Sequence, residues 1–134
     1  MRLLINIDVP ELAPAIDFYK AALGLHMNRI IDEAVAELTG ASAVIYLLRK
    51  AAGSSPEKTL TSVRHYTRHW TPVHFDVVVH NLEEAARRAI EAGALQESDC
   101  VEWMESKCIT FSDPFGHGFC LIEFADETYS NGTA

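Results

Sequence analysis

The sequence predicts an α+β protein in which two tandem βαβββ modules form one curved mixed sheet. Two observations predict it. The sequence pattern of Ile5–Val9 and Leu12 is repeated in the second half by Phe75–Val79 and Leu82. In both halves a strand-like alternation is followed by a helical period and then by three further alternating stretches. Because one module alone leaves a face of its small sheet uncovered, we expect both to fold together as a single domain over residues 1–134.

The first module, residues 1–50, opens with a strand and a helix. Apolar and polar residues alternate through Ile5–Val9, and Pro10 follows the strand. A helical spacing of apolar residues predicts a helix over 13–23, and Gly24 is a natural stop for it. Three more strands are expected at Met27–Ile31, Ala34–Leu38 and Ala43–Arg49, joined by short polar turns.

The second module, residues 73–125, repeats this order. Asn81 is a suitable N-cap for a helix over 82–92, which Gly93 ends. Asp113, Pro114 and Gly116 occupy the first, second and fourth places favoured by a type I turn, which predicts a hairpin. The later strands are expected at Val101–Met104, Lys107–Phe111 and His117–Phe124.

A long connection, residues 51–72, joins the modules, and a polar tail, residues 126–134, follows them and is expected to be loose. Connections of this length are typically lids, binding loops or disordered segments. With Arg49 and Lys50 included, the connection carries five of the eleven basic residues. It would guide an anionic substrate towards an otherwise acidic protein, or it is simply a solvated surface loop.

Composition excludes several classes of protein. A net charge of -8 disfavours general nucleic-acid binding. The chain has no apolar run of about 18 residues that would span a membrane, and its N-terminus does not resemble a signal peptide. Three cysteines without CxxC spacing favour a reducing cytoplasm over a disulfide framework or a structural zinc knuckle.

Strand alternation assigns the faces of the sheet. Leu3, Ile5, Ile7 and Val9 are expected to pack on a helix, as are Val73, Phe75, Val77 and Val79 in the second module. The face that no helix covers then gathers five residues of mixed polarity, a combination typical of a small-molecule cleft. These residues are Asn6, Tyr46, His74, Asp76 and Cys120.

Three motifs carry a resemblance to a known family: Val9-Pro10-Glu11-Leu12 leading into Ala15–Tyr19, then Leu23-Gly24-Leu25, and finally Asp113–Gly116. With the repeated module they resemble the vicinal oxygen chelate superfamily, which includes glyoxalase I, extradiol dioxygenases and bleomycin-resistance proteins. The resemblance covers roughly residues 3 to 125. It implies the glyoxalase/bleomycin-resistance/dioxygenase fold but no single activity, because this architecture hosts isomerases, oxygenases and binders.

The resemblance also locates where a divalent metal would bind. Metal-using relatives hold the ion with His, Gln or Glu from the first and fourth strands of each module, and those places here are Leu4, Tyr46, His74 and Cys120. Only His74 is a typical ligand, and Cys120 suits neither magnesium nor manganese. Glu123 has an odd offset from Cys120 and is expected on the opposite face. We therefore predict that the usual metal centre is absent, although a divalent metal held by other ligands stays open.

Further candidates lie outside the strand faces. His69 and Trp70 end the connection and either contact a ligand beside His74 or anchor the connection to the sheet. Trp103 either caps the cleft or fills space. A metal site of His65, His69 and His74 is disfavoured because Pro72 breaks any helix that would align them.

Four functions are compatible with these residues. The first is a homodimeric, metal-independent receptor in which Tyr46, Trp70 and Trp103 stack on a flat ligand. The second is a metal-dependent lyase or dioxygenase, in which His69 or Asp76 joins His74 as a ligand. The third is an acid/base enzyme without metal, with His74 accepting a proton and Tyr46 donating to an oxyanion. The fourth, a purely structural role, is least favoured because polar groups line the cleft face.

Overall fold

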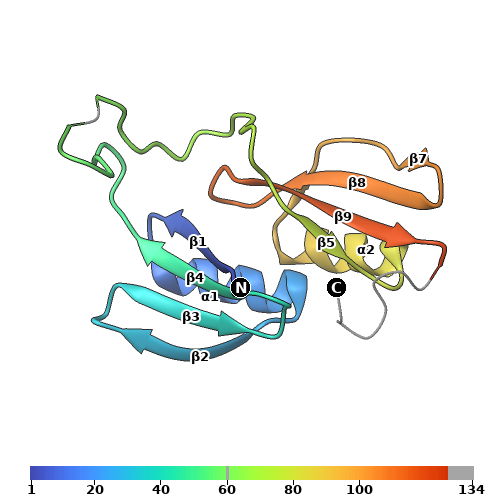
Figure 1. Cartoon of the computed structure of the whole chain (residues 1–134), viewed down its shortest axis with the longest axis horizontal. Coiled ribbons are helices and arrows are strands. Elements are labelled where there is room, and N and C mark those ends of the chain that lie inside the picture. The colour runs from blue at the N-terminus through green and yellow to red at the C-terminus, as the bar shows by residue number, and fades with distance from the viewer. Residues whose placement is uncertain (60, 127–134) are drawn as a thin grey trace.

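The computed structural model of the chain describes residues 1–59 and 61–126, and the expected loose tail falls almost entirely outside them. The two predicted modules are present in order (Figure 1). The first contains β1 (Leu4–Val9), α1 (Leu12–Leu23), β2 (His26–Ile31), β3 (Val35–Thr39) and β4 (Val44–Arg49). The second contains β5 (Asp76–Val78), α2 (Leu82–Ala92), β6 (Leu95–Gln96), β7 (Val101–Trp103), β8 (Ser106–Ser112) and β9 (Gly118–Phe124). The α+β fold class is thus confirmed.

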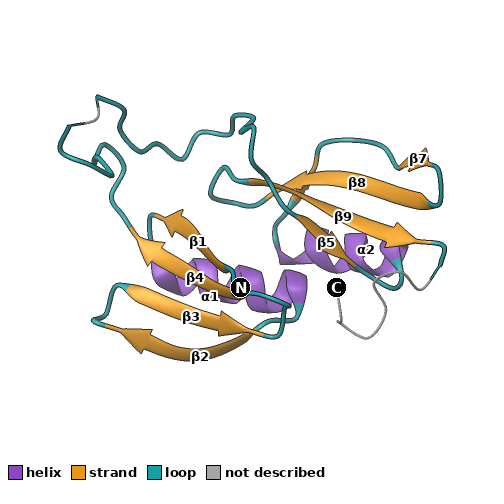
Figure 2. Cartoon of the chain, viewed as in Figure 1, coloured by secondary structure: helices purple, strands orange, loops and turns teal. Residues whose placement is uncertain are grey.

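Hydrogen bonding divides the strands between two sheets. One has the order β1-β4-β3-β2, and the other has the order β5-β9-β8-β6, with β7 also paired to β8. In each module the first strand is parallel to the last, and the remaining pairs are antiparallel. Strands β1 and β5 are therefore the edges of their sheets, and the two helices lie behind the sheets in Figure 2.

Both helices end as their sequences indicate. Gly24 and Gly93 adopt left-handed backbone angles, with φ of 69° and 118°, which a residue with a Cβ adopts only under strain. Asn81 accepts a hydrogen bond from the backbone N–H of Glu84, so its predicted role as N-cap is confirmed. Glu123 accepts from the N–H of Leu82 and thus faces α2, on the side opposite the open face of its sheet.

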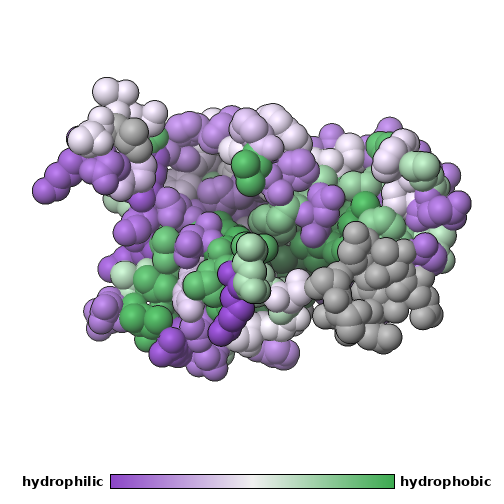
Figure 3. Space-filling model, viewed as in Figure 1, coloured by the Kyte–Doolittle hydropathy of each residue, from purple (hydrophilic) through white to green (hydrophobic). Residues whose placement is uncertain are grey.

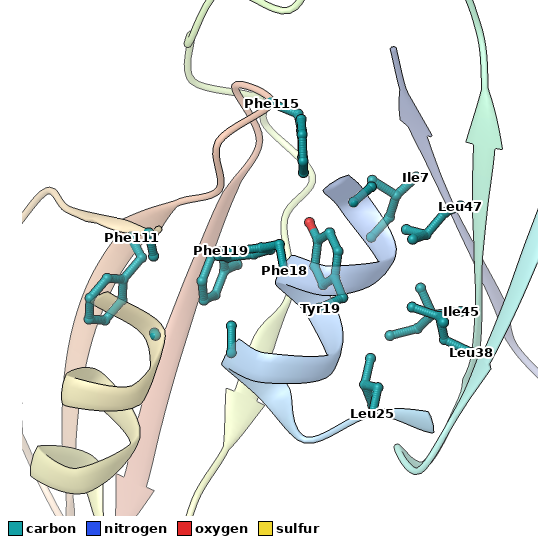
Figure 4. Packing of buried hydrophobic residues seen from close by; sticks show 14 of the residues in the cluster. Ile7, Phe18, Tyr19, Leu25, Leu38, Ile45, Leu47, Phe111, Phe115 and Phe119 are labelled. Atoms are coloured by element: carbon teal, nitrogen blue, oxygen red, sulfur yellow. The ribbon is translucent and has the colours of Figure 1, made fainter. Parts of the chain in front are cut away.

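The modules share one core, in which side chains of α1 contact the second module (Figure 4). Phe18 packs edge-on against Phe115 and Phe119 of the second module. The hydroxyl of fully buried Tyr19 donates to Oδ2 of Asp113 at 2.5 Å. Asp113 is the first residue of the predicted hairpin turn, and the backbone N–H of Gly116 donates to the Asp113 carbonyl at 3.4 Å. A second hydrogen bond between the halves joins His117 Nε2 to the carbonyl oxygen of Asp8 at 2.6 Å. Hydrogen bonds and an aromatic cluster therefore join the two halves.

The connection is anchored to both modules by side-chain contacts. Arg64 pairs with Asp8 of β1 at 2.6 Å, and the hydroxyl of Tyr66 donates to the carbonyl of Lys50. Further along, Arg68 forms two hydrogen bonds with Glu97. Two of its basic residues are consequently neutralised within the fold.

Two packing predictions in the strands are wrong. Val73 is 88% exposed because β5 begins only at Asp76, and Leu3 is 69% exposed because β1 begins only at Leu4. Trp70, just ahead of Val73, is also largely exposed. Among the described residues, no helix is long and apolar enough to cross a membrane.

Candidate functional site

A cleft of about 800 Å³ lies where the two modules meet. Its walls are apolar, with Ile5, Leu25 and Ile45 from the first module and Phe75 and Val77 from the second. Figure 3 shows hydrophobic atoms gathered at a hollow between the two halves. Its polar lining comes from Ser42 and from Asp76, His80, Asn81, Glu84 and Arg88.

The topology explains why the cleft is there. β1 is an edge of one sheet and β5 is an edge of the other, and the two strands are not hydrogen-bonded to each other. Residues of both strands line the cleft, as does the turn between β3 and β4, residues 40–43. The cleft also reaches the helices, because Leu23 of α1 and Glu84 and Arg88 of α2 line it.

Three of the predicted site residues come together on the second module. Asp76 of β5 lies beside Cys120 of β9 in the parallel register, and His74 precedes β5. His74 Nε2 is 3.6 Å from Asp76 Oδ1. One candidate ligand atom from each of the three residues lies within 4.8 Å of the others. Of the predicted set, only Asp76 also lines the cleft.

Cys120 lies at the base of this cluster. It is 6% exposed, whereas His74 and Asp76 are exposed. The Thr110 hydroxyl is 3.5 Å from the Cys120 sulfur. Burial, assisted by the neighbouring Cys120 thiol, raises the pKa of Cys108 to about 12, so Cys108 is a neutral thiol at physiological pH.

Tyr46 and Asn6 lie on the other sheet, opposite each other on β4 and β1. The Tyr46 hydroxyl donates to Oε2 of Glu37 at 2.8 Å. Glu37 also accepts from Asn28 at 2.6 Å and from Arg29 at 3.2 Å. A register shift between Met27 and Arg29 accompanies this convergence of Asn28 and Arg29 on one carboxylate.

These hydrogen bonds fix the ionisation of the Glu37 group. The Asn28 bond, followed by those from Tyr46 and Arg29, lowers the pKa of Glu37 to about 2. The hydrogen bond to Glu37 in turn raises the pKa of Tyr46. The Tyr46 hydroxyl already donates its hydrogen bond to Glu37. Tyr46 can therefore act as a donor to an oxyanion only if this hydrogen bond breaks.

The remaining predicted residues are dispersed. Trp70 packs on His74, with ring centroids 5.0 Å apart. His69 packs instead on His65 at 4.6 Å, and neither belongs to the metal-capable group found among the described residues. Trp103 is 72% exposed on β7 and does not line the cleft. His74, His65 and His69 therefore do not form a three-histidine site, and a cap by Trp103 is not formed in this structure.

Residues 4–122 match the family model of the glyoxalase-like domain. The chain belongs to this family. It therefore lies within the vicinal oxygen chelate superfamily that its motifs resemble. No curated protein matches the sequence of this glyoxalase-like domain.

Solved structures share the fold of this glyoxalase-like domain at low sequence identity. A glyoxalase/bleomycin resistance protein/dioxygenase family enzyme from Burkholderia phytofirmans PsJN is 15% identical with a TM-score of 0.70, over 90% of this chain and 96% of that one. Lactoylglutathione lyase from Agrobacterium tumefaciens is 15% identical with a TM-score of 0.63, over 92% of each chain. TioX from Micromonospora sp. ML1 is 15% identical with a TM-score of 0.64, over 94% of this chain and 98% of that one.

The side chains at the four family positions of this glyoxalase-like domain do not fit the usual metal centre. Leu4 offers no donor atom, and the Tyr46 hydroxyl donates to Glu37. His74 and Cys120 both belong to the second module, and they supply one nitrogen and one sulfur. Two ligands of that kind do not complete the oxygen-rich octahedral shell of a hard cation.

Sequence reasoning missed two parts of the site in this glyoxalase-like domain. Glu37 lies opposite Tyr46 in the register of β3 and β4, so pairing the predicted hairpin strands residue by residue is a signal that finds it. The polar residues of the cleft, among them His80 and Arg88, carry no such signal. They become neighbours of Ile5 and Leu25 only through the placement of one module beside the other.

Proposed function

We propose that this protein binds a small, largely apolar organic molecule in the cleft between its modules, without the usual metal centre of the superfamily. The observation that carries the proposal is the cleft itself, about 800 Å³ with apolar walls. Ligand sites typically measure about 300–1,000 Å³ and combine apolar walls with a few polar groups. Asp76, His80 and Arg88 are the polar groups that would orient a ligand here.

The proposal can be tested with a fluorescent apolar anion, 8-anilinonaphthalene-1-sulfonate (ANS), on protein treated with a chelator. We expect one molecule to bind the folded protein and to raise its melting temperature, since a ligand that binds only the native state stabilises it. Ser42→Trp places an indole at an exposed residue of the cleft wall and should abolish this binding. Ala51→Trp also introduces an indole at an exposed residue, but outside the cleft, and should leave this binding intact.

Two results would contradict the proposal. One is ANS binding that is equal in both tryptophan variants, which would place the probe elsewhere. The other is stabilisation that appears only after a divalent ion is added back, which would make the metal part of the ligand site.

A second candidate is a metal-dependent lyase or dioxygenase acting on a substrate with vicinal oxygens. The specific observation in its favour is the approach of His74, Asp76 and Cys120 to one another, which would allow Asp76 to join His74 as an atypical ligand. Elemental analysis of protein purified without chelator distinguishes the candidates. A stoichiometric iron, nickel, zinc or manganese content that His74→Ala abolishes favours the enzyme.

We also propose a cytoplasmic homodimer. The three cysteines are free thiols, as expected in a reducing compartment. Light scattering after size-exclusion chromatography tests the dimer: a mass of twice 14.9 kDa supports it and a mass of 14.9 kDa contradicts it.

A further inference from the structure

The cleft carries its apolar surface and its charges on different modules. Every residue that the first module contributes to the lining is apolar or a glycine, except Ser42. The charged side chains of the lining, Asp76, Glu84 and Arg88, all come from the second module. We infer that the cleft recognises an amphipathic zwitterion, a molecule with an apolar body and with an ammonium and an acid group on neighbouring atoms. The inference rests on the proposed function and deepens it by naming the chemical class of the ligand.

The cleft is separate from the place where metal-using relatives bind their ion. The strand residues Ile5, Ile45 and Val77 line it, and they belong to the core or pack against it. Residues of both helices line it as well. None of the four family metal positions, all of which the structure describes, belongs to the lining. The cleft therefore opens on the helix side of the sheets, with Asp76 reaching it from the edge strand β5.

Helix α2 presents one acid and one base to the cleft. Glu84 and Arg88 both line it, and a spacing of four residues places them on the same face of the helix. Glu83 and Arg87, each one residue earlier, line a separate groove between α2 and strands β6 to β8. Arg87 pairs there with Glu91 at 3.1 Å. The helix thus offers two charge pairs of the same composition, of which only one faces the cleft.

The charges of Glu84 and Arg88 are available to a ligand. Both residues are exposed, and neither has an ion-pair partner among the residues that the structure describes. Side chains four residues apart on a helix begin roughly 5–6 Å from each other. An ammonium and an acid group on neighbouring atoms of one ligand can therefore meet Glu84 and Arg88 at the same time. A guanidinium suits a carboxylate in particular, because it donates two parallel hydrogen bonds to it.

The balance of charge in the lining favours a zwitterion over a simple ion. Asp76 and Glu84 bring two negative charges, which disfavour a ligand that is only an anion. Arg88 disfavours a ligand that is only a cation. The volume of about 800 Å³ exceeds what a small head group fills, and the apolar wall of the first module would receive the rest of the molecule.

Calorimetric titration of the chelator-treated full chain with three ten-carbon probes, each below its micelle concentration, tests the inference. The probes are 2-aminodecanoic acid, decanoic acid, which lacks the ammonium, and decylamine, which lacks the acid. We expect the wild type to bind 2-aminodecanoic acid most tightly. Arg88→Gln should weaken the binding of 2-aminodecanoic acid and decanoic acid by about threefold to tenfold, without weakening that of decylamine. Glu84→Gln should weaken the binding of 2-aminodecanoic acid and decylamine to a similar extent, without weakening that of decanoic acid.

The neighbouring residues supply matched controls. Glu83→Gln and Arg87→Gln make the same changes of charge on the other groove and should change the three affinities by less than about twofold. The inference is overturned if these controls act as strongly as Glu84→Gln and Arg88→Gln, or if each cleft variant weakens all three probes equally. It is also overturned if the wild type binds either singly charged probe more tightly than 2-aminodecanoic acid. In each of these cases, ANS binding that Ser42→Trp abolishes would leave the cleft proposal standing.

Discussion

Replacing Tyr19 with phenylalanine tests how the two modules are joined. The change removes only the hydroxyl that donates to Asp113 across the module boundary at 2.5 Å. Asp113 is 4% exposed, and its other oxygen already accepts from the N–H groups of Phe115 and His117. Burial, reinforced by Asp113, raises the pKa of Tyr19 well above its usual value, so the hydroxyl keeps its proton at neutral pH.

The cost of Tyr19→Phe follows from these contacts. A buried hydrogen bond to a carboxylate contributes about 1.5–3 kcal/mol, and the orphaned oxygen pushes the loss towards the upper end. For a domain of this size, 1 kcal/mol corresponds to roughly 3–5 °C in melting temperature. We therefore expect the melting temperature to fall by roughly 5–15 °C, in a single transition because the core is shared.

Differential scanning calorimetry and urea unfolding measure this loss. Tyr66→Phe is the matched control, because its hydroxyl donates to a neutral carbonyl at an exposed position and should cost only about 0.5–1.5 kcal/mol. A loss in Tyr19→Phe no larger than that in Tyr66→Phe would refute the reasoning. So would two separate transitions in the wild type, which would mean that the modules unfold independently.

Two further predictions concern the Glu37 group and the anchoring of the connection. The folded pKa of Glu37 is lowered from 4.5 to about 2, so its ionised form adds stability above pH 4.5 that is lost as the pH falls towards 2. The stability difference between the wild type and Glu37→Gln should therefore shrink over that interval in urea titrations, and a constant difference would contradict it. Gly116→Ala would place a Cβ 2.4 Å from the Tyr66 carbonyl oxygen, whereas Gly53→Ala meets nothing within 4 Å, although both glycines have positive φ. Gly53→Ala should lower the free energy of unfolding by about 1–2 kcal/mol, because alanine is strained at a positive φ. Gly116→Ala should lower it clearly more, because its Cβ also meets Tyr66. Equal losses in urea unfolding would mean that the connection does not contact the turn closely.

The local elements were predictable because their signals are local. Gly24, Gly93 and Asn81 ended or began helices as expected, since capping depends on a few neighbouring residues. Alternation assigned Asp76 and Cys120 to one face of the sheet, and the parallel register of β5 and β9 makes them direct neighbours there. The prediction that Val73 packs on a helix is wrong, because the alternation in the sequence extends beyond the point where β5 begins.

The cleft was not predictable in the same way. Asn6 and Tyr46 were expected to share one surface with His74, but the two sheets are not hydrogen-bonded to each other and each keeps its own cluster. The cleft forms where β1 and β5 leave their edges unpaired, so its lining depends on how the modules are placed rather than on the pattern within either one. The composition of the connection predicts a charged, solvated loop, but Arg64 and Arg68 form ion pairs with partners far along the chain.

A crystal structure of the chelator-treated protein grown with ANS tests the central proposal most directly. The account predicts density for one probe molecule between β1 and β5, with its rings against Leu25 and Val77 and its sulfonate towards Arg88. It would be contradicted by β1 and β5 closing into one continuous sheet with the probe bound only on an outer surface.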